Sequence, residues 1–141
     1  MEAVTYFEKA CENGFPRGCA NAGLLLINNN ESIPKDIPKG LALLTKACEQ
    51  DRGEACAMLG TAHLMGNYSL AKDAEKALQL LTKGCELGSL QGCTNASRMY
   101  KTGDGVKRND ALSEKYRKKA VEIKQSRDGT GGKQGVSLGR T

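Results

Sequence analysis

Six cysteines divide this chain into three units of equal length. Cys11, Cys48 and Cys85 are 37 residues apart, and so are Cys19, Cys56 and Cys93. The residues around the first cysteine of each pair recur as Lys-Ala-Cys-Glu, Lys-Ala-Cys-Glu and Lys-Gly-Cys-Glu. A period of this length indicates a stack of repeated supersecondary units, in which each unit buries its apolar face only against a neighbour.

Each unit is predicted to contain two helices joined by a tight turn. We expect the first helices at about 2–13, 38–50 and 73–87, and the second at about 17–28, 54–66 and 90–102. Apolar residues of the third unit recur at helical spacing. Gly14 and Gly88 lie where a left-handed residue would end a helix, and Asp51 holds that place in the middle unit. The predicted fold is all-α, a right-handed α/α solenoid of three hairpins.

Small residues recur in every unit and are expected to let the two helices of one hairpin approach closely: Ala10, Ala47, Gly84, Gly23, Gly60 and Ser97. A fourth unit begins with Lys-Ala-Val-Glu, in which Val121 replaces the cysteine, and no second helix follows. We therefore predict a repeat domain over 1–125, with repeats at about 2–37, 38–72 and 73–109 and a capping helix at 110–125. The Gly-, Ser- and Lys-rich tail, 126–141, is predicted to be disordered.

Three interpretations of the cysteines compete. A zinc site usually uses short Cys-x2–4-Cys spacings, whereas here seven residues separate the members of each pair. Free buried thiols would not explain why cysteines occur in pairs and disappear with the second helix. Disulfides explain both observations, so we predict bonds within each hairpin: Cys11–Cys19, Cys48–Cys56 and Cys85–Cys93. Persistent disulfides indicate an oxidising compartment.

Composition limits the other classes of protein. The net charge is +5, and residues 107–141 carry ten Lys or Arg against four Asp or Glu. This basic end contains Tyr116 as its single aromatic residue and no recognised nucleic-acid motif, so a solvated terminal helix is the preferred interpretation. No apolar run approaches the ~20 residues of a membrane span. The first residues do not form a secretory signal, and we expect Met1 to lie inside a helix.

The repeated pattern resembles the Sel1-like repeats, relatives of the tetratricopeptide repeat, in their cysteine-rich form. The resemblance covers residues 1 to about 125, and the unit from Cys93 to Lys101 followed by Gly103–Val106 resembles family members that assist assembly of cytochrome c oxidase. It implies a monomeric, non-enzymatic scaffold for respiratory complex IV in the mitochondrial intermembrane space. Such members carry further repeats before the point where this chain starts, so we expect the chain to be part of a longer protein or a shortened product. We expect protein partners, no nucleic acid, no cofactor, no metal and no catalytic residues.

Two alternatives to the scaffold remain open. His63, the single histidine, could ligate haem or a metal with Met58 or Met65 as a second donor, which would indicate a haem- or metal-handling chaperone. Its repeat equivalents are Leu26 and Tyr100, which favours a packing role. The second alternative is an adaptor in the lumen of the endoplasmic reticulum, since glycosylation triplets begin at Asn30, Asn67 and Asn95.

One name used for the resembling proteins refers to β-lactamases, and short motifs of that chemistry do occur in this chain. Ser-x-x-Lys occurs at Ser32–Lys35 and Ser69–Lys72, and Lys-Thr-Gly occurs at Lys101–Gly103. In serine β-lactamases a Ser-Asp-Asn motif completes this set, and it is absent here. Both serine motifs are predicted to lie in loops between repeats, so we expect no hydrolase activity.

Overall fold

The computed structural model describes residues 2–28 and 33–128, and this part of the chain forms seven α-helices. These are α1 (Glu2–Glu12), α2 (Pro16–Ile27), α3 (Ile37–Glu49), α4 (Gly53–Met65), α5 (Ala74–Glu86), α6 (Leu90–Thr102) and α7 (Asp110–Arg127). Each predicted helix is present, and each boundary lies within two residues of its prediction. The predicted tail began too early, because residues 126 and 127 still belong to α7; residues 129–141 lie outside the described residues.

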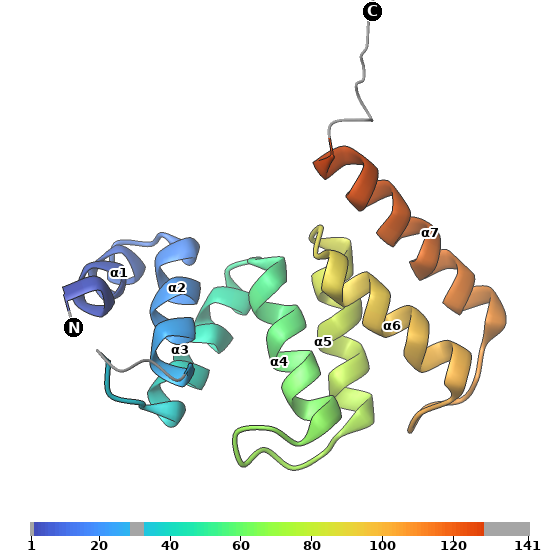
Figure 1. Ribbon diagram of the computed structural model, residues 1–141, viewed down its shortest axis with the longest axis horizontal. Helices are drawn as coiled ribbons and strands as arrows, with labels where there is room; N and C mark the ends of the chain where they lie inside the picture. Colours follow the sequence, from blue (N-terminus) through green and yellow to red (C-terminus); the bar gives the residue numbers. More distant parts are fainter. Residues whose placement is uncertain (1, 29–32, 129–141) are drawn as a thin grey trace, which may run out of the picture.

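The helices follow one another in a row from α1 at one end to α7 at the other (Figure 1). Each helix packs against its neighbours in sequence, and further contacts join α4 with α6 and α5 with α7. Contacts that run only between near neighbours are typical of a solenoid. The structure confirms the predicted all-α solenoid of three hairpins, with α7 covering the last of them.

The turn inside each hairpin has the same backbone geometry. Gly14, Asp51 and Gly88 adopt φ values of +89°, +66° and +98°, in the left-handed region. The next residue in each hairpin then donates its N–H to a carbonyl of the first helix: Phe15 to Ala10, Arg52 to Ala47 and Ser89 to Gly84, at 3.0, 2.9 and 2.8 Å. The turn is therefore specified by a single left-handed residue, and Asp51 is the one of the three that is not glycine.

The connections between hairpins also repeat one device. The helices that follow these connections begin after Asp36, Asp73 and Asn109, whose side chains each accept a hydrogen bond from the backbone N–H three residues later. Their own N–H groups donate to the carbonyls of Leu26, His63 and Tyr100 at 2.9, 3.0 and 2.9 Å. Each new hairpin is thus attached to the preceding second helix at a fixed place.

The small residues bring together different helices from those the sequence predicted. A Cβ atom added to Gly23 of α2 would lie 2.8 Å from the carbonyl oxygen of Gly40, and one added to Gly60 of α4 would lie 2.8 Å from Leu81 Cγ. These contacts cross from one hairpin to the next, so the assignment of Gly23 and Gly60 to contacts within a hairpin was wrong. Gly18 makes the close contact inside the first hairpin, where a Cβ would lie 2.7 Å from Ala10 Cβ.

The core is built from modest side chains, in keeping with the absence of tryptophan. The largest fully buried residues are Leu44, Leu81, Met99 and Val4, and half-cystines come next. Since helices can pack closely only where the intervening side chains are small, this composition suits a thin stack of helices.

Candidate functional site

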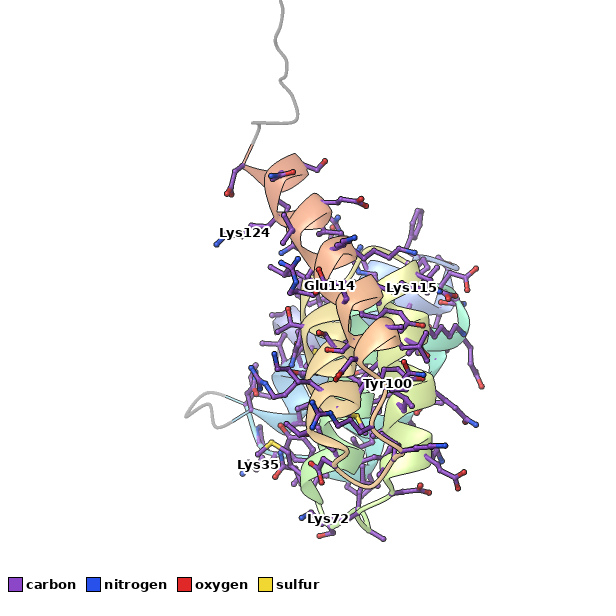
Figure 2. The ribbon with its side chains drawn as sticks, turned by 90° about the vertical axis from the view of Figure 1, so that its right-hand side faces the viewer. Lys35, Lys72, Tyr100, Glu114, Lys115 and Lys124 are labelled. Atoms are coloured by element: carbon purple, nitrogen blue, oxygen red, sulfur yellow. A yellow bond between two sulfur atoms is a disulfide. The ribbon has the colours of Figure 1, made fainter. Side chains whose placement is uncertain are left out.

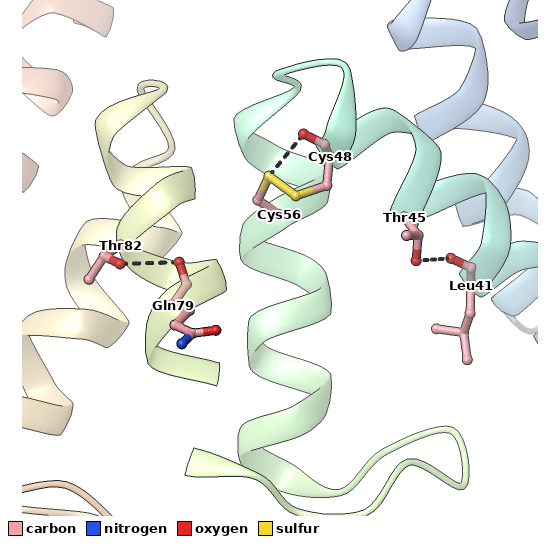
Figure 3. The surroundings of a disulfide bond; sticks show 6 residues. All are labelled: Leu41, Thr45, Cys48, Cys56, Gln79 and Thr82. Atoms are coloured by element: carbon pink, nitrogen blue, oxygen red, sulfur yellow. Dashed lines mark hydrogen bonds between the residues drawn. A yellow bond between two sulfur atoms is a disulfide. The ribbon is translucent and has the colours of Figure 1, made fainter. Parts of the chain in front are cut away.

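Three disulfides close the hairpins at their turn ends. Cys11–Cys19, Cys48–Cys56 and Cys85–Cys93 are bonded, with Cα–Cα distances of 4.5, 4.7 and 4.5 Å, and all six residues are buried. Figure 3 shows the middle bond between the end of α3 and the start of α4. Cys56 Sγ also lies 3.5 Å from the carbonyl oxygen of Cys48. A disulfide sulfur carries no hydrogen, so that contact can be a hydrogen bond only in the reduced protein.

The second helices of the hairpins share one side of the stack. We use "second-helix face" for the outward residues of α2, α4 and α6. A polar bridge joins two of these helices: Gln91 Nε2 and Asn95 Nδ2 of α6 donate to Thr61 Oγ1 of α4 at 3.2 and 3.1 Å. The Thr61 hydroxyl in turn donates to the carbonyl of Ala57 at 3.0 Å. These hydrogen bonds join α4 to α6. The amide groups of Gln91 and Asn95 can also hydrogen-bond a peptide.

A hollow of about 120 Å³, which we call the Tyr68 hollow, opens on this face beside the polar bridge. Its lining comes from α2, α3, α4, α6 and the loop after α4: Ile27, Leu41, Leu44, Met58, Leu59, Thr61, Ala62, Asn67, Tyr68 and Gln91. The floor is apolar, and Thr61, Asn67 and Gln91 supply polar groups. A mostly apolar lining with a few polar groups is typical of binding sites.

The loop that carries Tyr68 is held in an unfavourable backbone conformation. Tyr68 and Ser69 have φ values of +57° and +64°, which side chains other than glycine rarely adopt. The 37-residue repeat places Gly105, with φ +73°, at the position of Tyr68 in the next unit. The chain thus keeps a large aromatic residue where glycine is the easier choice, and that side chain lines the hollow.

A second, wider hollow of about 450 Å³ lies further along α6, and we call it the Arg98 hollow. Leu64 and Met99 supply apolar surface, while Asn95, Arg98, Thr102 and Asp104 supply polar groups. Asn95 belongs both to this lining and to the polar bridge. The two hollows are therefore neighbours on the same face.

The second helices carry few acidic groups. α2 and α6 contain no Asp or Glu, whereas Arg17, Arg98 and Lys101 lie on them and are exposed. The one acidic residue of α4, Glu54, pairs with Arg52 at 3.4 Å. The charge of this face is consequently positive. This face has no signature in the sequence, because its residues come from three helices and form no motif.

The capping helix α7 packs on α6 through a different kind of contact. Ser97 Oγ donates to the carbonyl of Ser113 at 2.8 Å, and Ser113 Oγ donates to the carbonyl of Ser97 at 2.9 Å. The Tyr116 ring stacks on Tyr100, and burial, with a smaller contribution from Glu86, raises the pKa of Tyr116. On the exposed side, the hydrogen bond from Arg117 lowers the pKa of Glu114.

His63 does not meet Met58 or Met65 in a ligand arrangement. A helix turns about 100° per residue, so these two side chains project roughly 140° and 160° away from His63 around α4. His63 is half-buried at the packing position of Leu26 and Tyr100, and its Nδ1 atom is buried without a hydrogen-bond partner. Within residues 2–28 and 33–128, no three His, Cys, Asp or Glu side chains gather as a metal site would need.

The β-lactamase motifs do not assemble. Ser69 and Lys72 are exposed in the loop between α4 and α5, whereas the catalytic serine of that class begins a buried helix. Residues 101–103 end α6 and do not form a strand. Figure 2 shows Lys35 and Lys72 at the lower side of the molecule and Lys124 of α7 near its top. Ser32 lies outside the described residues.

The glycosylation triplets differ in access. Asn67 is exposed in the loop after α4, whereas Asn95 is half-buried in α6 and bonded to Thr61. Asn30 lies outside the described residues. Over the described ranges, no helix is both long enough and apolar enough to cross a bilayer.

The repeat pattern and the fold now agree with one family. The Sel1 repeat pattern matches residues 1–15, 16–51, 53–89 and 90–122. This chain belongs to the Sel1 repeat family. The family's repeat is phased from one second helix to the next first helix, so its limits fall in the hairpin turns. The predicted division into disulfide-closed hairpins places the limits in the longer connections instead.

Known relatives extend the comparison. Cytochrome c oxidase assembly factor 7 of Xenopus tropicalis is 37% identical over 123 residues, which are 87% of this chain and 37% of that protein. The chain therefore spans little more than a third of that relative's length. The Helicobacter pylori cysteine rich protein B has a similar structure, with a TM-score of 0.66 and 31% identity, and the match covers 86% of both chains. A Sel1 repeat protein from Oxalobacter formigenes gives a TM-score of 0.77 at 25% identity, covering 89% of this chain and 51% of that one.

The family and the geometry together assign a general role. Sel1 repeats mediate protein interaction, and this chain presents a helical stack with a hollowed face. The chain is a protein-interaction scaffold.

Proposed function

We propose that this protein is an assembly factor for mitochondrial respiratory complex IV and acts in the intermembrane space. The observation that carries the proposal is the 37% identity, across most of this chain, to a protein named cytochrome c oxidase assembly factor 7. The match covers 87% of this chain, so it does not rest on a single repeat.

The disulfides support the proposed compartment. Three buried bonds close the hairpins, and such bonds persist only where the surroundings are oxidising. The intermembrane space is an oxidising compartment. It also agrees with the mitochondrial association that the relative's name implies. The lumen of the endoplasmic reticulum would also meet it, so the location needs a direct measurement.

We infer that the second-helix face is the surface that holds the partner. It carries the Tyr68 hollow, the polar bridge and a positive charge. Binding energy would come from an anchored side chain in the hollow rather than from the whole face, as in other protein interfaces.

The proposal is tested by removing the gene from cells of the source organism. We expect fully assembled complex IV on native gels and cytochrome c oxidase activity to fall by more than half, while complexes II and V stay unchanged. Re-expression of the full gene product should restore both. Normal complex IV after complete loss of the protein would contradict the proposed role.

Location is measured in the same cells. When isolated mitochondria are treated with protease, the protein should be digested only after the outer membrane has been opened. A mobility shift on glycosidase treatment that disappears in Asn67→Gln would instead place the protein in the secretory pathway.

A further inference from the structure

The size of the Tyr68 hollow restricts which side chain it can accept. A cavity of about 150 Å³ holds benzene, so a hollow of about 120 Å³ has room for one small apolar side chain and not for the two fused rings of tryptophan. It does fit the side chain of leucine, isoleucine or methionine. Buried Leu44, Leu59 and Ala62 form apolar walls, and a matching aliphatic group would gain free energy from leaving water.

Side-chain amides line the path away from this hollow. Gln91 and Asn95 each use one N–H to bond Thr61, and each amide has a second N–H and a carbonyl oxygen for other partners. A primary amide offers the same donor and acceptor pair as a peptide bond. The two side-chain amides on α6 can therefore hydrogen-bond the backbone of an extended peptide, as the edge of a β-sheet does.

Positive charge follows the amides. Arg98 lies seven residues after Gln91, on the same side of α6, and lines the Arg98 hollow. No described residue lies within salt-bridge distance of Arg98, and Lys101 adds to the charge of this end of α6. Asp104 lines the same hollow and opposes the positive potential in part. The charge of the face is complementary to an acidic segment.

We propose that the second-helix face binds an extended acidic segment of its partner, which inserts an aliphatic side chain into the Tyr68 hollow and places a carboxylate at Arg98. Seven helical residues cover about 10 Å at 1.5 Å each, which equals about three residues of extended chain at 3.3 Å. The recognised feature is accordingly an aliphatic residue and an acidic residue three positions apart. This inference rests on the proposed scaffold function and names the chemistry of its partner.

Synthetic peptides of twelve residues provide the probe. The reference peptide carries Leu-Gly-Ser-Glu in a Gly- and Ser-rich background with a fluorescent label, and the same peptide is made in reverse order. We expect fluorescence polarisation to show weak binding, with a dissociation constant on the order of 100 μM, because a short flexible peptide loses much conformational freedom. Replacing Leu by Ala should weaken binding at least tenfold, and replacing Leu by Trp should weaken it as well.

Protein variants test the charge. Arg98→Glu should weaken binding of the reference peptide at least fivefold at 50 mM salt. The loss should be smaller at 300 mM salt, because salt screens exposed charges. Lys76→Glu makes the same change at an exposed site of α5, a first helix, and should leave binding unchanged. Asp104→Asn should strengthen binding about twofold. Circular dichroism of each variant verifies that the fold is retained.

The outcomes separate this inference from the proposed function. Equal binding of the Leu and Trp peptides, or of wild type and Arg98→Glu, overturns the inference, as does the absence of binding by both peptide orders at 2 mM. If gene loss lowers complex IV and Arg98→Glu restores it as well as wild type, the assembly role stands and the inference fails. If gene loss leaves complex IV normal while the peptides bind as expected, the proposed function fails and the binding chemistry stands.

Discussion

The turn ends of the hairpins and the crossings between hairpins are built on opposite principles. Each turn end repeats the same parts, namely a buried disulfide, a left-handed residue and one backbone hydrogen bond across the turn. The crossings differ from one another. Gly23 meets Gly40 at the first, Gly60 approaches Ala77 at the second, and two serines exchange hydrogen bonds at the third.

This difference indicates where the structure is fixed and where it can vary. Covalent closure restricts the unfolded chain of each hairpin in the same way, whatever its other residues are. The angle and spacing of successive hairpins depend on atoms that touch at a single place, so each crossing needs its own side chains. We therefore expect changes at the turn ends to act through the unfolded chain and changes at the crossings to act through packing.

The largest expected effect comes from reducing all three disulfides. Each bond closes a loop of eight or nine residues and contributes about 2.5 kcal/mol in the chain-entropy model, so complete reduction should lower the free energy of unfolding by roughly 7 kcal/mol. We expect helical circular dichroism at 37 °C to be mostly lost in dithiothreitol. As a control, alkylation before reduction should label no cysteine. If the reduced protein melted within a few degrees of the oxidised protein, the crossings alone would hold the stack.

A smaller effect is expected when the first crossing is filled. The Cβ of Gly40→Ala would lie 2.4 Å from Ile27 Cγ2 and 2.9 Å from the carbonyl oxygen of Gly23. Overpacking destabilises the fold, and the better helix propensity of alanine offsets part of that cost. We expect a net loss of about 2 kcal/mol in the free energy of unfolding, measured in urea. Gly60→Ala should cost less, since its nearest contacts, Leu81 Cγ at 2.8 Å and the Ala77 carbonyl oxygen at 3.1 Å, are both longer. Equal losses of stability in Gly40→Ala and Gly60→Ala would show that the first crossing is not packed more tightly than the second.

At the third crossing, the hydrogen bonds between α6 and α7 can be deleted singly and together. Ser97→Ala or Ser113→Ala should each destabilise the protein by about 1 kcal/mol, because each removes one donated hydrogen bond and leaves the accepting carbonyl bonded within its helix. A double-mutant cycle by thermal unfolding measures the coupling. If both single variants unfold like wild type, the contact does not hold the cap and α7 is fixed by the tyrosine stack instead.

The smallest effect is a gain in stability at the middle turn. Asp51 adopts φ +66°, so Asp51→Gly should stabilise the fold by up to about 0.5 kcal/mol after the entropy of the unfolded glycine is included. Gly88→Ala is the matched control, because its Cβ would meet nothing within 4 Å while φ stays at +98°. It should destabilise by about 1 kcal/mol through the backbone alone. A loss of stability in Asp51→Gly would mean that the aspartate side chain supports the turn.

The sequence was most informative where structure is local. The cysteine spacing, the turn residues and the apolar periodicity predicted seven helices, their order and the disulfide-closed hairpins, since all of these depend on residues close together in the chain. It was least informative about the site. Tyr68 could have been noticed only as a mismatch with Gly105 in the aligned repeats, and Thr61, Gln91 and Asn95 follow no motif.

What the sequence by itself determined is the repeating hairpin, because helix periodicity, a left-handed turn and two cysteines eight residues apart act within one unit. What only the tertiary structure decided is how the units meet. Gly23 faces Gly40 and not its own hairpin partner, and the Tyr68 hollow draws its walls from four helices and a loop. Contacts of that kind depend on the relative placement of whole helices, and no short stretch of the chain specifies that placement.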